Sequence, residues 1–157
     1  MTEGEWNDFL NRSKGWFVRL SFELLHSDAY KKLNYGPGLK VLNWFHEKIK
    51  VEVNKKKHGK NRYRIINNGE IDFTYREAAF RGLTPQKFRK ALEELHGIGF
   101  IDIKKPGSAL KGDFTVYTFS ERWKAYGTPN FRQVEFQKSI HWVNFGFGSK
   151  REKHKKS

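Results

Sequence analysis

The densest group of chemically active side chains is a basic stretch near the middle of the chain. Residues 55–64 contain no Asp or Glu and carry six cationic side chains, Lys55, Lys56, Lys57, Lys60, Arg62 and Arg64. Crowded cations repel one another, and a nucleic-acid backbone relieves that repulsion by neutralising them. Tyr63 lies among them and offers a ring on which a base can stack, although a contact within a hairpin explains it equally well. The stretch predicts a phosphate-binding loop, against the alternative of a solvated loop tip.

A second group of polar side chains occupies one face of a helix expected over residues 84–96. Its apolar stripe is Phe88, Ala91, Leu92 and Leu95. With this stripe in the core, a turn of 100° per residue directs Gln86, Lys90 and Glu93 outward, flanked by Lys87 and Arg89. Arg and Lys suit guanine O6 and N7, and Gln suits adenine. The alternative is an ordinary solvated helix face of mixed charge.

The start of this helix adds contacts to phosphate, whereas its later turns oppose them. Thr84 and the backbone N–H groups beside it can bind phosphate. Glu93 and Glu94 repel phosphate, so only the first two turns are expected to enter a groove. A later hairpin tip over residues 104–113 adds Lys104, Lys105 and Lys111, which suit a DNA backbone or, equally, a solubilising hairpin.

Other chemistry has little support in the residues. The six His show no metal-ligand spacing, the acids are scattered, there is no Cys, and no Gly-rich loop leads from a strand into a helix. His46 lies on the apolar side of its helix and is expected to be a core or boundary residue. We therefore expect no cofactor, no metal and no catalytic residue, and the protein is not expected to be an enzyme.

The whole chain is strongly basic and unevenly so. Its 157 residues have a formal net charge of +14, with +6 in residues 54–64 and +8 in residues 104–157. Aromatics make up 16% of the residues, which is enough to close a core despite a modest apolar content. No apolar run approaches a membrane span of about 20 residues. These features predict a soluble cytoplasmic protein with a polyanionic partner and no membrane association.

Apolar periodicity and turn residues predict a mixture of short helices and strands. Ser27 and Thr74 are expected to cap helices, and Gly82 and Gly97 to end them. The pattern predicts strands over 16–22, 71–73, 100–104 and 114–119, helices over 27–33, 39–50, 75–80 and 84–96, and a helical turn over 121–126. The aromatics of residues 131–145 have strand-like spacing without an assigned place.

The order of these predicted helices and strands, together with four sequence motifs, resembles that of a known protein family. The relevant motifs are Ser27-x-Ala29-Tyr30-x-x-Leu33, Asn68-Gly69-x-Ile71-x-Phe73-Thr74-Tyr75, Gly82-Leu83 and Ala91-Leu92-Glu93-Glu94-Leu95-x-x-x-Gly99-Phe100-Ile101. Together they resemble the winged helix-turn-helix proteins of phages and bacterial mobile elements, over residues 17–120. The chain departs from them at Tyr35-Gly36-Pro37-Gly38, where a polar cap is expected, and in a longer, more basic 51–70 connection.

The resemblance implies an α+β winged-helix domain over residues 16–126, with a flexible arm over 1–15 and a C-terminal extension over 127–157 that ends in a disordered basic tail. It implies a nucleoid-associated, double-stranded DNA-binding protein that controls transcription or replication, with the 84–96 helix in the major groove and the 104–113 wing and the 55–64 loop on the backbone. The alternatives are an RNA or single-strand binding module and a protein-interaction adaptor. A homodimer through residues 121–147 stays open.

Overall fold

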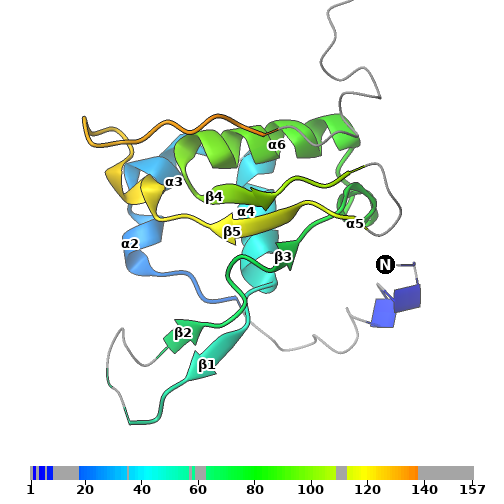
Figure 1. Ribbon diagram of the computed structural model, residues 1–157, viewed down its shortest axis with the longest axis horizontal. Helices are drawn as coiled ribbons and strands as arrows, with labels where there is room; N and C mark the ends of the chain where they lie inside the picture. Colours follow the sequence, from blue (N-terminus) through cyan, green and yellow to red (C-terminus); the bar gives the residue numbers. More distant parts are fainter. Residues whose placement is uncertain are drawn as a thin grey trace, which may run out of the picture.

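The protein has an α+β fold with two small antiparallel sheets (Figure 1). The computed structural model describes residues 2, 4–5, 7–8, 18–34, 36–56, 58, 63–108 and 113–137. The elements are α2 (Phe22–Leu25), α3 (Asp28–Lys32), α4 (Pro37–Glu47), β1 (Val51–Val53), β2 (Tyr63–Ile65), β3 (Ile71–Asp72), α5 (Tyr75–Phe80), α6 (Pro85–Ile98), β4 (Ile101–Lys105), β5 (Val116–Phe119) and the 3₁₀-helix η2 (Arg122–Ala125). The expected α+β class is confirmed. Most of the arm over 1–15 and the tail from residue 150 lie outside the described residues.

The three-stranded sheet has the order β3–β5–β4, so the last strand in sequence lies in the middle. Ile101 and Ile103 on β4 lie on its inner face together with Tyr117, which pairs with Ile103. Asp102 and Thr118, which pair with each other, lie on the outer face because side chains alternate along a strand. The sheet therefore has one apolar face to bury and one polar face.

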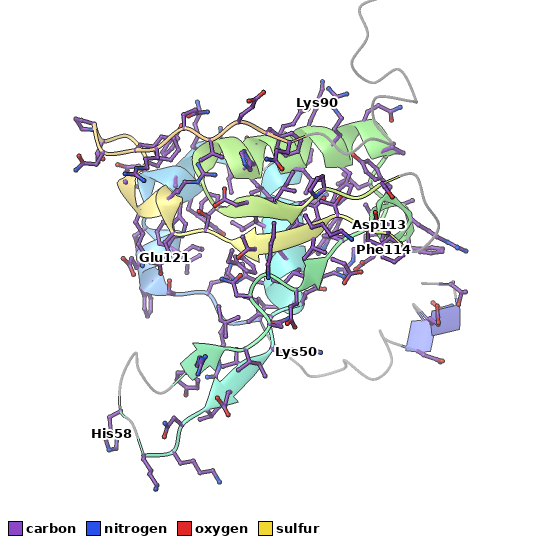
Figure 2. All side chains as sticks on the ribbon, in the orientation of Figure 1. Lys50, His58, Lys90, Asp113, Phe114 and Glu121 are labelled. Atoms are coloured by element: carbon purple, nitrogen blue, oxygen red, sulfur yellow. The ribbon has the colours of Figure 1, made fainter. Side chains whose placement is uncertain are left out.

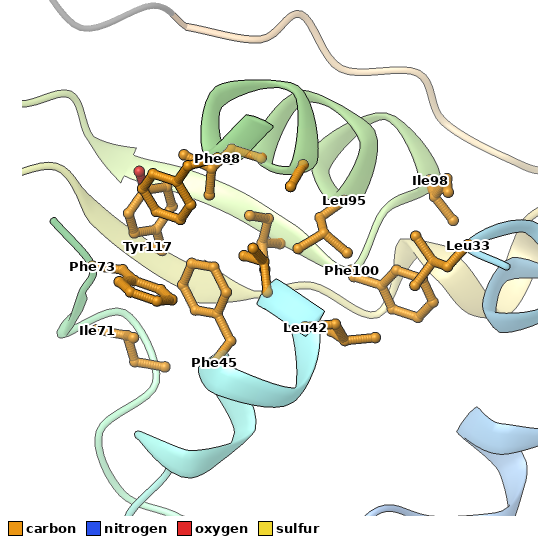
Figure 3. Packing of buried hydrophobic residues seen from close by; sticks show 14 of the residues in the cluster. Leu33, Leu42, Phe45, Ile71, Phe73, Phe88, Leu95, Ile98, Phe100 and Tyr117 are labelled. Atoms are coloured by element: carbon orange, nitrogen blue, oxygen red, sulfur yellow. The ribbon is translucent and has the colours of Figure 1, made fainter. Parts of the chain in front are cut away.

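Helices α4 and α6 provide the surface that covers this apolar face (Figure 3). The rings of Phe45, Phe88 and Phe100 are almost completely buried there. The centroid of the Phe45 ring lies 5.3 Å from that of Phe73 and 5.2 Å from that of Tyr117, in edge-on contacts. Such contacts add about 1 kcal/mol each to the hydrophobic gain, which accounts for a core closed by few but large side chains.

Side-chain caps start the helices where the sequence predicts them. Ser27 Oγ accepts a hydrogen bond from the Tyr30 N–H at 3.1 Å, and Thr74 Oγ1 accepts one from the Glu77 N–H at 3.1 Å. Each satisfies a backbone donor that lacks a partner within the helix. Helix α4 begins at Pro37 rather than Leu39, since proline is pre-organised for the first helical position.

Two local expectations are wrong, and part of the segment over residues 131–145, to which the sequence assigned no place, is located by the structure. Residues 18–21 have no regular structure and Phe22 begins helix α2 instead of ending a strand, because Ser21 Oγ caps the Leu24 N–H at 3.2 Å. Helix α6 continues through Gly97 to Ile98, because Gly99 adopts the left-handed conformation (φ 95°) that ends it. Residues 131–137 form no strand and run along α6 (Figure 1).

Candidate nucleic-acid interface

The first two turns of α6 present an exposed polar surface. Thr84 Oγ1 caps the helix by accepting a hydrogen bond from the Lys87 N–H at 3.4 Å. Thr84, Gln86, Lys87 and Lys90 are exposed, whereas the stripe Phe88, Ala91, Leu92 and Leu95 is buried. Lys87 and Lys90 form no ion pair with another described residue. Both are therefore available to an external anion.

Arg89 differs from these lysines. It is half-buried, and its Nε donates to Glu93 Oε1 at 3.1 Å, one helical turn further on. An ion pair at this spacing reduces the local positive charge and orients the guanidinium along the helix. The structure therefore separates the predicted helix residues into two available lysines and one arginine that already has a partner.

The base of the predicted wing is held by its own ion pair. Lys105 Nζ lies 2.7 Å from Asp113 Oδ1, and this bond, with those from Ser108, lowers the pKa of Asp113 to about 2. The side chain of Lys104 lies over Gly69, where an added Cβ would be 3.0 Å from Nζ. The Lys105–Asp113 pair therefore joins the two sides of the connection between β4 and β5, whereas Lys104 lies against the turn before β3. Lys111 lies outside the described residues.

The basic stretch lies on a hairpin formed by β1 and β2. Lys55 and Lys56 are exposed in the turn after β1, where the Lys56 N–H donates to Asn54 Oδ1 at 3.0 Å. Arg64 is exposed on β2 and pairs in register with Glu52. The remaining predicted residues of this stretch, Lys57, Lys60 and Arg62, lie outside the described part of the chain.

The helix surface and the hairpin lie on different sides of the molecule. Figure 2 shows Lys90 at the top of the view and His58 of the hairpin at the lower left. The three-stranded sheet and α4 lie between them (Figure 1), while α5, Asp113 and Phe114 lie at the opposite end of the view from the hairpin (Figure 2). The predicted site residues therefore fall into separate surfaces.

A buried ion-pair network, which the sequence analysis missed, joins α4 to α5. Glu77 is 3% exposed, and its carboxylate lies 2.7 Å from Lys48 Nζ and 3.1 Å from Arg81 Nη2. Arg81 Nη1 also lies 2.7 Å from Glu47 Oε2.

The network borders an open cleft of about 390 Å³. Four carboxylates, those of Glu47, Glu70, Asp72 and Glu77, line the cleft against the three cations Lys48, Lys50 and Arg81, so the cleft does not suit a phosphate. The network joins α5 to the end of α4. Lys48 and Glu77 are 29 positions apart in the sequence and meet only in the folded protein, so the sequence gives no sign of this network.

His96 is buried, whereas His46 is half-buried with both ring nitrogens enclosed. His46 packs beside Phe119, with 4.9 Å between ring centroids, and its ring nitrogens have no hydrogen-bond partner among the described residues. Burial lowers its pKa to about 4. His96 Nε2 lies 3.6 Å from Asp102 Oδ1, and burial, reinforced by Arg122, lowers its pKa. His46 therefore lies at the boundary of the core, and neither histidine belongs to a cluster that could hold a metal within the described residues.

Comparisons with protein families, curated proteins and solved structures give no match for this chain. Within the described residues, no helix has both the length and the apolar character needed to cross a lipid bilayer. The functional argument therefore depends on the surfaces described above.

Proposed function

We propose that residues 37–119 form a winged helix-turn-helix that binds double-stranded DNA without catalysing a reaction. The order α4, β3, α5, α6, β4, β5 and the strand order β3–β5–β4 support this architecture. A tight turn joins α5 to α6, with Gly82 at φ 80° and the Leu83 N–H donating to the Ala78 carbonyl at 2.9 Å. In such a module the second helix of the pair enters the major groove.

One observation carries the proposal. The exposed first turns of α6 place Gln86, Lys87 and Lys90 on the surface, while the same helix buries its apolar stripe against α4 and the sheet. Lys90 reads base edges, and Lys87 with Thr84 contacts the backbone. The wing, held at its base by Lys105 and Asp113, flanks the duplex. The biological role that follows is control of transcription or replication.

The test compares a random duplex, single-stranded DNA and RNA of equal length in a fluorescence anisotropy titration across a salt series. We expect preference for the duplex and a steep fall in affinity with salt. The Lys90→Ala variant should change the sequence preference on a selected site, at a cost of about 1–3 kcal/mol at the base it contacts. A variant with the preference of the parent chain, or absence of binding at low salt, contradicts the proposal.

An RNA or single-strand binding module is the second candidate, and Tyr63 is the observation that favours it. Its ring is 44% exposed on the basic hairpin, with the Arg19 guanidinium 4.8 Å from its centroid. Of the Tyr and Trp side chains in the described ranges, it is the one that is exposed, whereas stacking platforms use several rings. Tighter binding of single strands than of duplex in the same titration would favour this candidate.

A further inference from the structure

The hairpin has an apolar face as well as a basic tip. In its register, Val51 pairs with Ile65 and Val53 pairs with Tyr63. Since side chains alternate along a strand, these four lie on one face of the ribbon. Each of them is between 40% and 48% exposed. A two-stranded ribbon of this kind has little stability of its own in water. The Arg19 guanidinium lies 4.8 Å from the centroid of the Tyr63 ring, so the exposed apolar surface of this face that a ligand can cover is mainly that of Val51, Val53 and Ile65.

The base of the hairpin is fixed to the body of the protein. Asn67 Oδ1 accepts a hydrogen bond from the Lys50 N–H, and Asn67 Nδ2 donates to the Lys48 carbonyl, both at 2.8 Å. The neighbouring Asn68 Oδ1 accepts from the Phe119 N–H at 2.6 Å, and its Nδ2 donates to the Phe119 carbonyl at 3.2 Å. These bonds tie both ends of the ribbon to α4 and β5, and so define the direction in which it projects.

That direction leads away from the proposed helix surface. Lys90 and His58 lie toward opposite ends of the view in Figure 2, with the sheet between them. A straight duplex seated on the outer side of α6 therefore does not meet the hairpin. Any ligand of the hairpin is a different molecule, or a different segment of the same one.

The charge of the hairpin identifies that ligand as a polyanion. Residues 51–65, which span the hairpin, contain six Lys and Arg and one acid, Glu52, which pairs in register with Arg64. Among nucleic acids, the duplex DNA major groove accepts a two-stranded ribbon, and apolar side chains there contact thymine methyl groups. A second copy of the chain suits the hairpin less well, because two basic tips repel. In addition, a stable interface buries about 800 Å² per partner. The four side chains of this face are each less than half exposed, so their exposed area is far below that value.

We propose that the β1–β2 hairpin binds a second DNA duplex segment and that one chain thereby joins two segments. This inference rests on the proposed function, in which α6 holds the first segment. The exposed tip residues Lys55 and Lys56 contact phosphates of the second segment, and the apolar face formed by Val51, Val53, Tyr63 and Ile65 lies against its groove.

The experiment uses the full chain, one duplex attached to beads and a second, fluorescent duplex in solution. The parent chain should capture the second duplex on the beads. The hairpin variant Lys55→Gln/Lys56→Gln and the helix variant Lys87→Gln/Lys90→Gln should each lose capture at least about tenfold, since joining needs both sites. Each should still bind a single duplex in anisotropy. The control Lys32→Gln/Lys40→Gln removes the same charge from exposed positions on α3 and α4, and should capture like the parent.

Capture that persists in the hairpin variant overturns the inference, as does capture that appears only where sedimentation shows a dimer. In both cases the α6 proposal remains. Failure of the parent chain to bind even one duplex overturns the proposed function instead. Capture of RNA in place of the second DNA duplex assigns the hairpin to another nucleic acid and contradicts the inference.

A second variant separates the apolar face from the charge. Val53→Thr/Ile65→Thr keeps the β-branched side chains that suit a strand and leaves every cation in place. We expect capture to fall several-fold, with the circular dichroism spectrum and the binding of a single duplex by α6 unchanged. Unchanged capture would show that the ribbon binds through its charge alone and would remove the groove contact from the inference.

Discussion

At the scale of single residues, the Glu77 carboxylate is an anion that the fold buries between two cations. It is almost fully buried and accepts from both Lys48 and Arg81, while its backbone N–H is capped by Thr74. Burial of an ion costs several kcal/mol, which is repaid only when its partners are complete. The position of α5 therefore depends on this residue.

Replacing Glu77 by Ala should destabilise the protein by about 3–5 kcal/mol, because two cations then lose their buried partner. Urea denaturation followed by circular dichroism measures the free energy of unfolding. Glu70→Ala removes an exposed carboxylate that borders the same cleft and serves as the control. It should change stability by no more than about 0.5 kcal/mol. Equal effects of the two substitutions on the free energy of unfolding would show that the buried ion pairs add no more stability than an exposed carboxylate.

His46 makes stability depend on pH. Its pKa is lowered from 6.5 to about 4 by burial, so between these values the unfolded chain binds a proton that the folded chain does not. The free energy of unfolding should therefore fall as the pH drops from 6.5 toward 4, by about 3 kcal/mol from this residue. The His46→Leu variant should show a shallower decline in pH-dependent urea denaturation. His58→Gln, at an exposed position, should keep the slope of the parent chain.

At the scale of elements, the end of α6 decides where β4 begins. Gly99 has φ 95°, and a Cβ added there would lie 2.7 Å from Arg122 Cβ and 2.8 Å from the Trp123 nitrogen. Arg122 also binds Asp102 on β4 and donates to the His96 carbonyl at 2.9 Å. The last turn of α6, the first residues of β4 and η2 are therefore packed together around one glycine.

Replacing Gly97 by alanine and replacing Gly99 by alanine should change the stability of the protein in opposite directions. Gly99→Ala should destabilise the protein by at least about 2 kcal/mol, because it combines a strained φ with a close contact. Gly97→Ala should stabilise it by about 0.5–1 kcal/mol, because Gly97 lies inside the helix and an added Cβ meets nothing within 4 Å. Thermal unfolding by calorimetry measures both. Loss of stability in Gly97→Ala would contradict the observed helix end.

At the scale of the whole molecule, the positive charge is concentrated in two parts of the sequence. The net charge of +14 lies mainly in residues 54–64 and 104–157, whereas the intervening segment, with α5 and α6, is nearly neutral. Within that segment, Glu93 offsets Arg89, and Lys87 and Lys90 stay available. For the proposed DNA binding, counterion release at the phosphates supplies a large share of the free energy.

The salt dependence of duplex binding should therefore follow individual lysines. Lys87→Ala should lower the slope of log K against log salt by about 1, as expected for one lost phosphate contact. Lys105→Ala should change the slope less, since Asp113 already neutralises that side chain. Anisotropy titrations at several salt concentrations give both slopes. Equal changes would show that the wing lysine contacts DNA despite its ion pair.

Several features of the fold follow from the sequence by itself, because they depend on neighbours in the chain. The caps Ser27, Thr74 and Thr84 act on backbone groups within three residues, and the stripe of α6 follows from helical periodicity. The cationic residues and their clustering are also visible in the sequence. Local chemistry thus predicted most of the elements and the polar helix face, but not helix α2 or the end of α6.

The tertiary structure alone decided what these residues face. It placed the hairpin and α6 on opposite sides, paired Lys105 with Asp113, and buried Glu77 between Lys48 and Arg81. It also ended α6 at Gly99 rather than Gly97, since η2 packs there. Contacts between residues far apart in sequence determine which charges are neutralised and which stay exposed, and neither composition nor spacing records those contacts.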